Sequence, residues 1–268
     1  MRSLILQGGG CRTFFQLGLL EVAGGVLGPF EEMGTVSASS AMGCIHALGI
    51  HGEAFRRFAL RVRGNRANFY PLRLLGGRRA TPHFDMYRDT ILECVSPSRF
   101  LELQRQPMRI RILIGVGPVR SAAVAVALAT YTAVTRRRSP FITPHIVDVR
   151  DLSGPEALAD AILTSSAFPP FTPLARLAGY GGRPGIDGGA VELIPLSLAS
   201  AGAEVTAILT RPAPPRPLPW SVRQIAPVEP LPVALWDYAN ERRLTETYDI
   251  GRRAGELLIP SLTCAQRV

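Results

Sequence analysis

The first fifty residues contain two short apolar segments, each of which runs into a glycine- or serine-rich turn and then into a helical pattern. Residues 3–7 are expected to form a buried strand, residues 8–10 a tight loop, and residues 12–26 a helix, because apolar side chains recur there with helical spacing. A second strand over residues 33–38 leads almost without a loop into a helix over residues 40–49. Two such units in series predict a parallel sheet flanked by helices.

Later segments continue the alternation of strands and helices. Residues 109–116 are apolar and β-branched enough for a core strand, and residues 145–149 give another. A helical pattern follows over residues 155–166, and a further strand is expected over residues 204–209. Residues 231–258 are mostly helical in pattern. The whole pattern therefore predicts an α/β fold.

The segment over residues 51–82 interrupts this alternation. It carries scattered arginines, breaks at Pro71 and at Gly76-Gly77, and has no regular apolar spacing. We expect it to pass over an edge of the sheet as a lid or a simple cover. Because 47% of the 268 residues are hydrophobic, the chain can bury one full core, and we expect a single domain over residues 1–268.

The formal net charge of +9 comes entirely from arginine, because the chain contains no lysine. Together with abundant Ala, Gly and Pro, this bias is typical of a GC-rich coding sequence and needs no functional cause. The alternative is that the surplus favours peripheral contact with an anionic membrane surface. The arginines form short, dispersed runs without interleaved aromatic residues, a pattern that argues against nucleic-acid binding.

Cysteine usage and apolar segments bear on the cellular setting. Cys11, Cys44, Cys94 and Cys264 are too few and too dispersed for a disulfide scaffold, and none forms a CxxC pair that would bind zinc. The apolar stretch before the first glycines is too short for a signal peptide. The apolar stretch over residues 121–134 falls short of the roughly 20 residues of a membrane-spanning helix. We therefore expect a cytoplasmic protein without a metal site.

The glycine run Gly8-Gly9-Gly10, followed by Arg12, is the first candidate for a functional site. Glycine after a strand lets backbone N–H groups approach a phosphate or an oxyanion closely at the start of a helix. A phosphate-binding P-loop needs a lysine that this chain does not have, and a dinucleotide-binding fingerprint needs a glycine where Thr13 stands. The run by itself therefore identifies no ligand.

Ser40 is the second candidate, because the predicted strand turns sharply into the predicted helix at this residue. A serine nucleophile on such a corner usually has the pattern Gly-x-Ser-x-Gly, whereas Ala38 and Met42 occupy the two glycine positions here. A serine at the junction of a strand and a helix is also a common N-cap. This segment alone does not separate the two roles.

Asp187 is the third candidate, because it follows an apolar residue and precedes two glycines, which places a carboxylate on a tight turn. A serine nucleophile needs a base, and the order Ser, Asp, His would require a histidine after the acid. No histidine follows Asp187. His46, His51 and His83 remain alternatives in another order, but a carboxylate base is the simpler assignment.

Four segments in chain order resemble the motifs of the patatin-like phospholipase family. They are Gly8-Gly9-Gly10-Cys11-Arg12, Ser39-Ser40-Ala41, Ser165-Ser166-Ala167-Phe168-Pro169-Pro170 and Asp187-Gly188-Gly189. As in that family, the glycine run begins the first helix, the serine turn follows one strand later, and the Asp-Gly-Gly turn lies in the second half. The resemblance covers most of the chain.

The resemblance implies a three-layer α/β/α sandwich with a mainly parallel central sheet. It implies that Ser40 attacks an ester carbonyl and that Asp187 acts directly as its base. The oxyanion would be stabilised by the N–H groups of Gly8, Gly9 and Gly10, with Arg12 supporting the loop. This chemistry needs no metal or organic cofactor. The reference pKa of aspartate is about 3.9, so the carboxylate must be partly desolvated to hold a proton during acyl transfer.

Three residues depart from the family pattern. Thr13 stands where the family usually has glycine after the arginine, and Ala38 and Met42 replace the glycines of the serine turn. If Met42 lies on the buried side of its helix, it pushes the helix away from the strand. If it points toward the cleft, it lines an acyl pocket.

The leading hypothesis is a serine acyl hydrolase that cleaves fatty-acyl esters of phospholipids or lysophospholipids, with residues 51–82 shaping access to the acyl groove. A second hypothesis is the same chemistry on a small soluble ester. A third is a non-catalytic binding or regulatory protein that kept the fold. The three departures favour this last reading, whereas the presence of both Ser40 and Asp187 argues against it.

Overall fold

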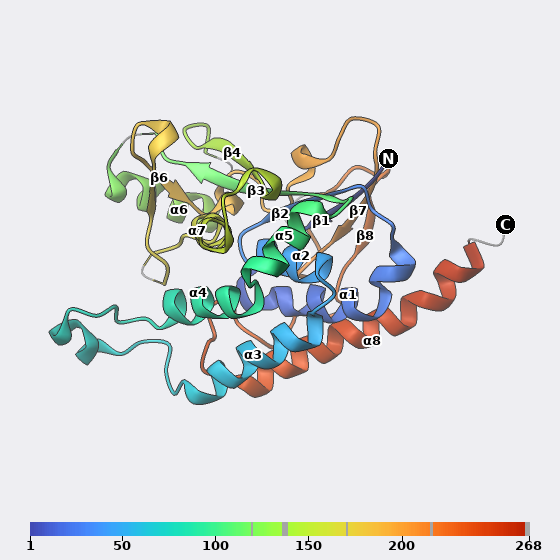
Figure 1. Ribbon diagram of the computed structural model, residues 1–268, viewed down its shortest axis with the longest axis horizontal. Coiled ribbons are helices and arrows are strands. Elements are labelled where there is room, and N and C mark those ends of the chain that lie inside the picture. The colour runs from blue at the N-terminus through green and yellow to red at the C-terminus, as the bar shows by residue number, and fades with distance from the viewer. Residues whose placement is uncertain (119, 136–138, 170, 215–216, 266–268) are drawn as a thin grey trace.

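The computed structural model describes residues 1–118, 120–135, 139–169, 171–214 and 217–265, so Pro170 of the third family motif lies outside the described residues. Its centre is an eight-stranded sheet (Figure 1). The strands are β1 (Arg2–Leu6), β2 (Glu32–Val36), β3 (Arg109–Val116), β4 (Thr143–Asp148), β5 (Ala175–Leu177), β6 (Arg183–Ile186), β7 (Glu204–Ile208) and β8 (Arg223–Ile225). The strand order is β5-β6-β3-β2-β1-β7-β8, and β4 also pairs with β3.

Five neighbouring strands, β8, β7, β1, β2 and β3, run parallel to one another. Their side chains alternate between the two faces of the sheet. In β1, for example, Leu4 and Leu6 join one hydrophobic cluster, whereas Ile5 joins another on the opposite face. Because both faces are covered, β1 and β3 contain adjacent buried apolar residues, Leu4-Ile5-Leu6 and Ile112-Leu113-Ile114.

At the carboxyl end of β3, strand pairing changes from parallel to antiparallel. β4 pairs antiparallel with β3 over Arg111–Val116 and therefore occupies one of its edges. β6 pairs antiparallel with Gly115 and Val116, so it must use the other edge, which β2 occupies up to Leu113. The carboxyl ends of β2 and β6 consequently meet beside β3.

Helices cover one face of the sheet in depth and the other face more thinly. They are α1 (Phe14–Leu27), α2 (Ser39–Ala47), α3 (His51–Gly64), α4 (His83–Cys94), α5 (Pro97–Arg105), α6 (Ala122–Thr135), α7 (Pro155–Ser165) and α8 (Glu241–Ala265). The largest hydrophobic cluster draws side chains from α1 to α5 and from α7. The opposite face is covered by α6 and by residues 188–200. The predicted three-layer α/β fold is confirmed.

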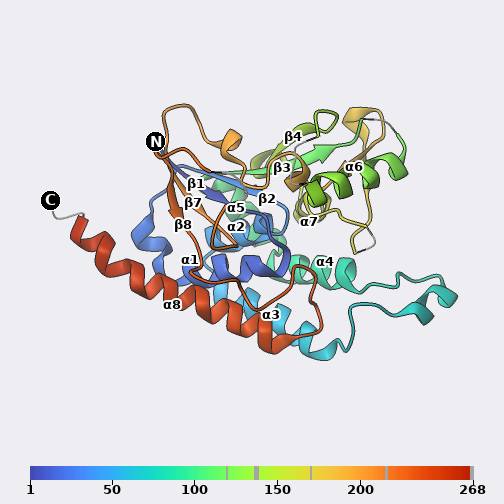
Figure 2. The same ribbon diagram turned by 180° about the vertical axis from the view of Figure 1, so that it is seen from behind.

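Helix α8 runs alongside α1 over much of its length, as both views show (Figures 1 and 2). Glycines allow this close approach. A Cβ atom built on Gly18 would lie 2.1 Å from the carbonyl oxygen of Tyr248, and one on Gly251 would lie 2.1 Å from that of Phe15. The last helix is thereby held against the helix that follows the glycine run.

Two predicted segments differ in the structure. Residues 231–240 are not helical, because the Asn240 side chain accepts a hydrogen bond from the Arg243 N–H and caps a helix that begins at Glu241. Residues 51–82 are not one irregular excursion, since His51–Gly64 forms α3, which packs against α1, α4 and α8. The helices of the described chain contain no apolar stretch long enough to cross a bilayer.

Candidate active site

The connection between β2 and α2 is a strained corner at Ser37. β2 ends at Val36, α2 begins at Ser39, and Ser37 has a φ of +58°. It is the one non-glycine residue with positive φ in the described chain. A side chain in this left-handed conformation costs of order 1–3 kcal/mol and persists only where the surroundings enforce it. Such strain is typical of a serine nucleophile between a strand and a helix.

Neighbouring serines hold this corner in place. The Ser37 N–H donates to Ser165 Oγ at 2.8 Å, and the Ser165 hydroxyl donates to the carbonyl of Leu113 in β3 at 2.6 Å. The Ser39 hydroxyl lies 3.0 Å from the carbonyl of Leu6 at the end of β1. The corner is thus hydrogen-bonded to two neighbouring strands and to the end of α7.

Ser37 lies directly against Asp187. The Ser37 hydroxyl donates to Asp187 Oδ2 at 2.7 Å, while Asp187 Oδ1 accepts the N–H of Gly189 at 2.7 Å. The Asp187 N–H donates to the carbonyl of Ala167 at 3.0 Å. These contacts follow from the meeting of β2 and β6, since Ser37 and Asp187 are the first residues after the two strands.

The environment of Asp187 makes its carboxyl group easier to protonate than that of an ordinary aspartate. Burial raises the pKa of Asp187 to about 6, and the hydrogen bonds from Ser37 and Gly189 oppose this shift without cancelling it. A carboxylate whose pKa is about 6 is a stronger base than an ordinary aspartate and is still mostly ionised at neutral pH. Asp187 is therefore suited to accept a proton from Ser37.

The predicted placement of Ser40 is wrong. Ser40 lies in the first turn of α2, is fully buried, and contacts the Thr35 hydroxyl at 3.2 Å. The strand ends at Val36 rather than at Ala38, so the corner falls three residues earlier than predicted, at Ser37, which is 5% exposed. The pattern around Ser37 is Thr35-Val36-Ser37-Ala38-Ser39, in which threonine and serine replace the two glycines.

The glycine run lies beside Ser37, whereas the family resemblance implied a place beside Ser40. A Cβ atom built on Gly8 would lie 3.2 Å from Ser37 Cβ. The start of the run is fixed by Thr210, whose hydroxyl donates to the Gly8 carbonyl at 3.1 Å and whose N–H donates to Gln7 Oε1 at 2.8 Å. The loop is therefore anchored to the chain segment that follows β7.

Only part of the predicted oxyanion-binding group is available to a ligand. The Gly8 N–H donates to the carbonyl of Leu193 at 3.0 Å, and the Arg12 N–H donates to the carbonyl of Gly9 at 3.1 Å. The Arg12 side chain donates to the carbonyl of Val233 at 3.3 Å, so Arg12 supports the loop. Among the described residues, no acceptor is bonded to the N–H groups of Gly9 and Gly10.

Replacing Gly10 with alanine is expected to destabilise the protein by about 2–4 kcal/mol. Gly10 has a φ of +52°, and an added Cβ would lie 2.1 Å from the backbone oxygen of Leu235. Gly25→Ala is the matched control, because Gly25 lies in α1 with no atom within 4 Å of the added Cβ. It should stabilise the protein by about 0.5–1 kcal/mol. Urea unfolding of both variants measures the difference, and equal effects would contradict this account.

The histidines considered as bases have other partners. His46 Nδ1 and His51 Nε2 lie 2.9 Å apart, and burial lowers the pKa of both side chains to about 4. His83 Nε2 donates to the carbonyl of Trp236 at 2.8 Å within a group of aromatic rings. In the described chain, no hydrogen bond joins any of the three to Ser37. No group of three or more His, Cys, Asp or Glu residues that could hold a metal ion is found among the described residues.

An apolar cavity begins next to the corner. Its volume is about 40 Å³, and it is lined by α1, α2, α3, α4, α7 and Tyr238. Gly10 and Ala38 line it close to Ser37, and Ala38, Ala41, Met42 and Ile45 continue along α2. Met42 therefore points into this cavity and does not separate α2 from the sheet. Of the two alternatives that the sequence left open for Met42, the one in which it points toward a cleft is therefore correct.

Comparison with known proteins identifies a family for the chain. Residues 4–200 match the model of a protein family described as patatin-like phospholipase. The matched segment includes the glycine run, Ser37 and Asp187. No curated protein matches the chain.

Proposed function

Since this chain belongs to the patatin-like phospholipase family, we propose that it is a serine acyl hydrolase in which Ser37 is the nucleophile and Asp187 its base. The observation that carries the proposal is the 2.7 Å hydrogen bond from the strained Ser37 to a carboxylate whose pKa is raised to about 6. Ser40 is not assigned this role, because its hydroxyl contacts Thr35, whereas the Ser37 hydroxyl contacts the Asp187 carboxylate.

In the proposed reaction, Ser37 Oγ attacks the ester carbonyl carbon while its proton passes to Asp187 Oδ2. The carbonyl oxygen becomes an oxyanion, which the free N–H groups of Gly9 and Gly10 stabilise. The intermediate then collapses, and the proton on Asp187 is transferred to the leaving alcohol. A water molecule, deprotonated by Asp187, next attacks the acyl-Ser37 ester, releases the fatty acid and regenerates the serine.

The apolar cavity supports a fatty-acyl ester as the substrate. Residues 38, 41, 42 and 45 follow the helical spacing of one face, so the cavity runs along α2 for about 10 Å from the corner. No charged side chain lines it. An acyl chain bound there would have its ester carbon at Ser37 and its head group outside, and the lining side chains would have to move apart to admit it, because the cavity volume is about 40 Å³. We therefore propose phospholipids or lysophospholipids as the substrate class.

Filling the middle of the cavity tests this assignment. Ala41→Leu should lower kcat/KM for a palmitoyl ester by about 10- to 100-fold and leave that for a butyryl ester within about threefold, because only a long chain passes Ala41. Ala47→Leu makes the same change on α2 at a half-buried position outside the cavity lining. A uniform loss across chain lengths in Ala41→Leu would show that the cavity does not hold the acyl chain.

A further inference from the structure

An arm formed by residues 65–82 projects from the body of the molecule between α3 and α4 (Figures 1 and 2). Its two sides are joined near the middle, where the Tyr70 N–H donates to the carbonyl of Ala80 at 2.7 Å. The tip is a short 3-10 helix over Pro71–Gly76, and none of its residues is buried. The arm therefore extends away from the sheet and does not cover it.

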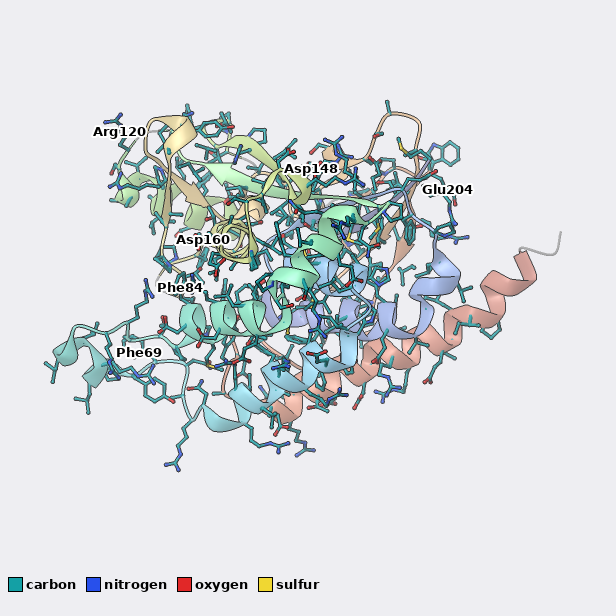
Figure 3. All side chains as sticks on the ribbon, viewed as in Figure 1. Phe69, Phe84, Arg120, Asp148, Asp160 and Glu204 are labelled. Atoms are coloured by element: carbon teal, nitrogen blue, oxygen red, sulfur yellow. The ribbon has the colours of Figure 1, made fainter. Side chains whose placement is uncertain are left out.

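The tip exposes large apolar side chains in a short stretch of sequence. Leu72 is 78% exposed and Leu75 is 88% exposed, and Leu74 and Phe69 are exposed beside them. Phe69 lies well beyond Phe84, where α4 begins (Figure 3). Scattered exposed leucines are ordinary, but a group of them on one projecting element indicates an interaction surface.

The charge of the arm has one sign. Residues 65–82 contain Arg66, Arg73, Arg78 and Arg79 and no acidic residue, which gives four positive charges. The Arg73 guanidinium lies over the Tyr70 ring, 4.3 Å from its centroid, and Arg79 pairs with Asp85 of α4 at 3.3 Å. Leucines and an aromatic ring surrounded by arginines are the composition of elements that bind the interface of anionic bilayers.

The base of the arm lies at the same end of the molecule as the active site. Asn65 Nδ2 donates to the carbonyl of Tyr238, a residue that lines the apolar cavity, at 2.7 Å. On the other side of the arm, His83 contacts Trp236, whose ring stacks on Phe168 at 5.6 Å. Phe168 directly follows Ala167, whose carbonyl accepts the Asp187 N–H.

We propose that residues 65–82 form a membrane-binding arm that inserts Leu72, Leu74 and Leu75 into the headgroup region of an anionic bilayer. The arginines of the arm contact lipid phosphates, and the active site is thereby held at the membrane surface. The benefit to catalysis rests on the proposed function, whereas the binding itself does not. A second copy of the chain is the rival occupant. Pairing of two tips would bring together four positive charges from each copy, and their repulsion disfavours a dimer. Lipid phosphates neutralise the same charges, so an anionic bilayer is the favoured partner.

The experiment is flotation of the Ser37→Ala protein with vesicles of phosphatidylcholine alone or mixed with phosphatidylglycerol. We expect binding to the mixed vesicles that falls as salt is raised. Leu72→Ser with Leu75→Ser should lower the partition coefficient by about 100-fold, because each leucine contributes about tenfold. Arg78→Gln should lower it by about fivefold.

Matched controls remove the same groups elsewhere. Trp220 is 97% exposed and Val228 is 94% exposed, so Trp220→Ser with Val228→Ser deletes two exposed apolar side chains away from the arm. Arg223→Gln, in β8, changes the net charge as Arg78→Gln does. Neither control should change binding by more than about twofold.

Three results would overturn the inference. The first is no binding to anionic vesicles, and the second is an equal loss of binding in the tip and control variants. The third is a protein that forms a dimer in the absence of vesicles and becomes a monomer when the tip leucines are replaced. The last would identify a second copy as the partner. Hydrolysis of a soluble butyryl ester by the tip variant in the wild-type Ser37 background tests the proposed function separately. If the chain binds vesicles but cleaves no ester, the arm proposal stands and the hydrolase proposal fails.

Discussion

Replacing Ser37 with alanine should lower kcat/KM for ester hydrolysis by about 10⁴- to 10⁶-fold, because the attacking oxygen is lost while the rest of the site remains. The same variant should not be labelled by a fluorophosphonate probe, which reacts covalently with an activated serine. Ser37 makes one side-chain hydrogen bond, to Asp187, so the variant should fold normally. Thermal denaturation checks that it does.

Ser40→Ala is the matched control, three residues away on the same turn. The Thr35 hydroxyl keeps the carbonyl of Arg111 as a partner at 3.0 Å, so no buried donor is left unpaired. We expect labelling to persist, activity to stay within about threefold of wild type, and stability to fall by about 0.5–1.5 kcal/mol. If Ser40→Ala abolishes labelling and Ser37→Ala does not, the assignment of the nucleophile is wrong.

The second large effect is expected for Asp187→Asn, which should lower kcat by about 10²- to 10⁴-fold through loss of the base. The raised pKa also predicts the pH dependence of the wild-type protein. Activity requires the ionised carboxylate, so kcat/KM should rise with pH and level off above the pKa of about 6. The amide variant should lose this acidic limb in its residual activity. A limb near pH 4 would show that Asp187 is not the titrating group.

The stability of the same variant provides an independent check. The pKa of Asp187 is about 6 in the folded chain and about 3.8 for an ordinary aspartate, so the folded state binds more protons between these values. Stabilisation from the protonated group is complete below pH 4 and is lost as pH rises through 6. Because Asp187 is partly exposed, we discount the full effect of the pKa shift. Between pH 4 and pH 8, the free energy of unfolding of Asp187→Asn should rise by about 1–2 kcal/mol relative to that of the wild type. Urea unfolding at the two pH values measures this change.

The strands that could be predicted from the sequence are those buried on both faces. The strand over residues 109–116 has the predicted bounds, because its isoleucines and Val116 lie between Pro107 and Gly117. β5, β6 and β8 were not predicted, since segments of three or four residues show no period. Residues 231–240 resemble the helix that follows them because their apolar side chains are buried, although their backbone is irregular.

The sequence placed the residues of the candidate site at or within three residues of the positions that the structure brings together. The glycine run and Asp187 lie where the sequence suggested, but the serine at the corner is Ser37, three residues before the predicted Ser40. Local propensity could not locate the end of β2, since Val36 to Ala41 are all small or β-branched. The end is set by β6, which takes over the edge of β3 beyond Leu113. The roles of Gly8 and Arg12 depend on Leu193 and Val233, which are distant in sequence.

β2 and β6 meet along one edge of β3, so a change in strand register would alter the contact between Ser37 and Asp187. The distance between Ser37 and Asp187 is set by β3, because each residue follows a strand whose register is fixed by pairing with β3. A slip of one residue in the pairing of Gly115 with Ile186 would move the carboxylate by about 3.3 Å and turn it to the other side of the sheet. A Cβ atom at Gly115 would lie 2.8 Å from Ile186 Cγ1. Residues that never touch a substrate therefore determine whether the serine and the carboxylate can exchange a proton.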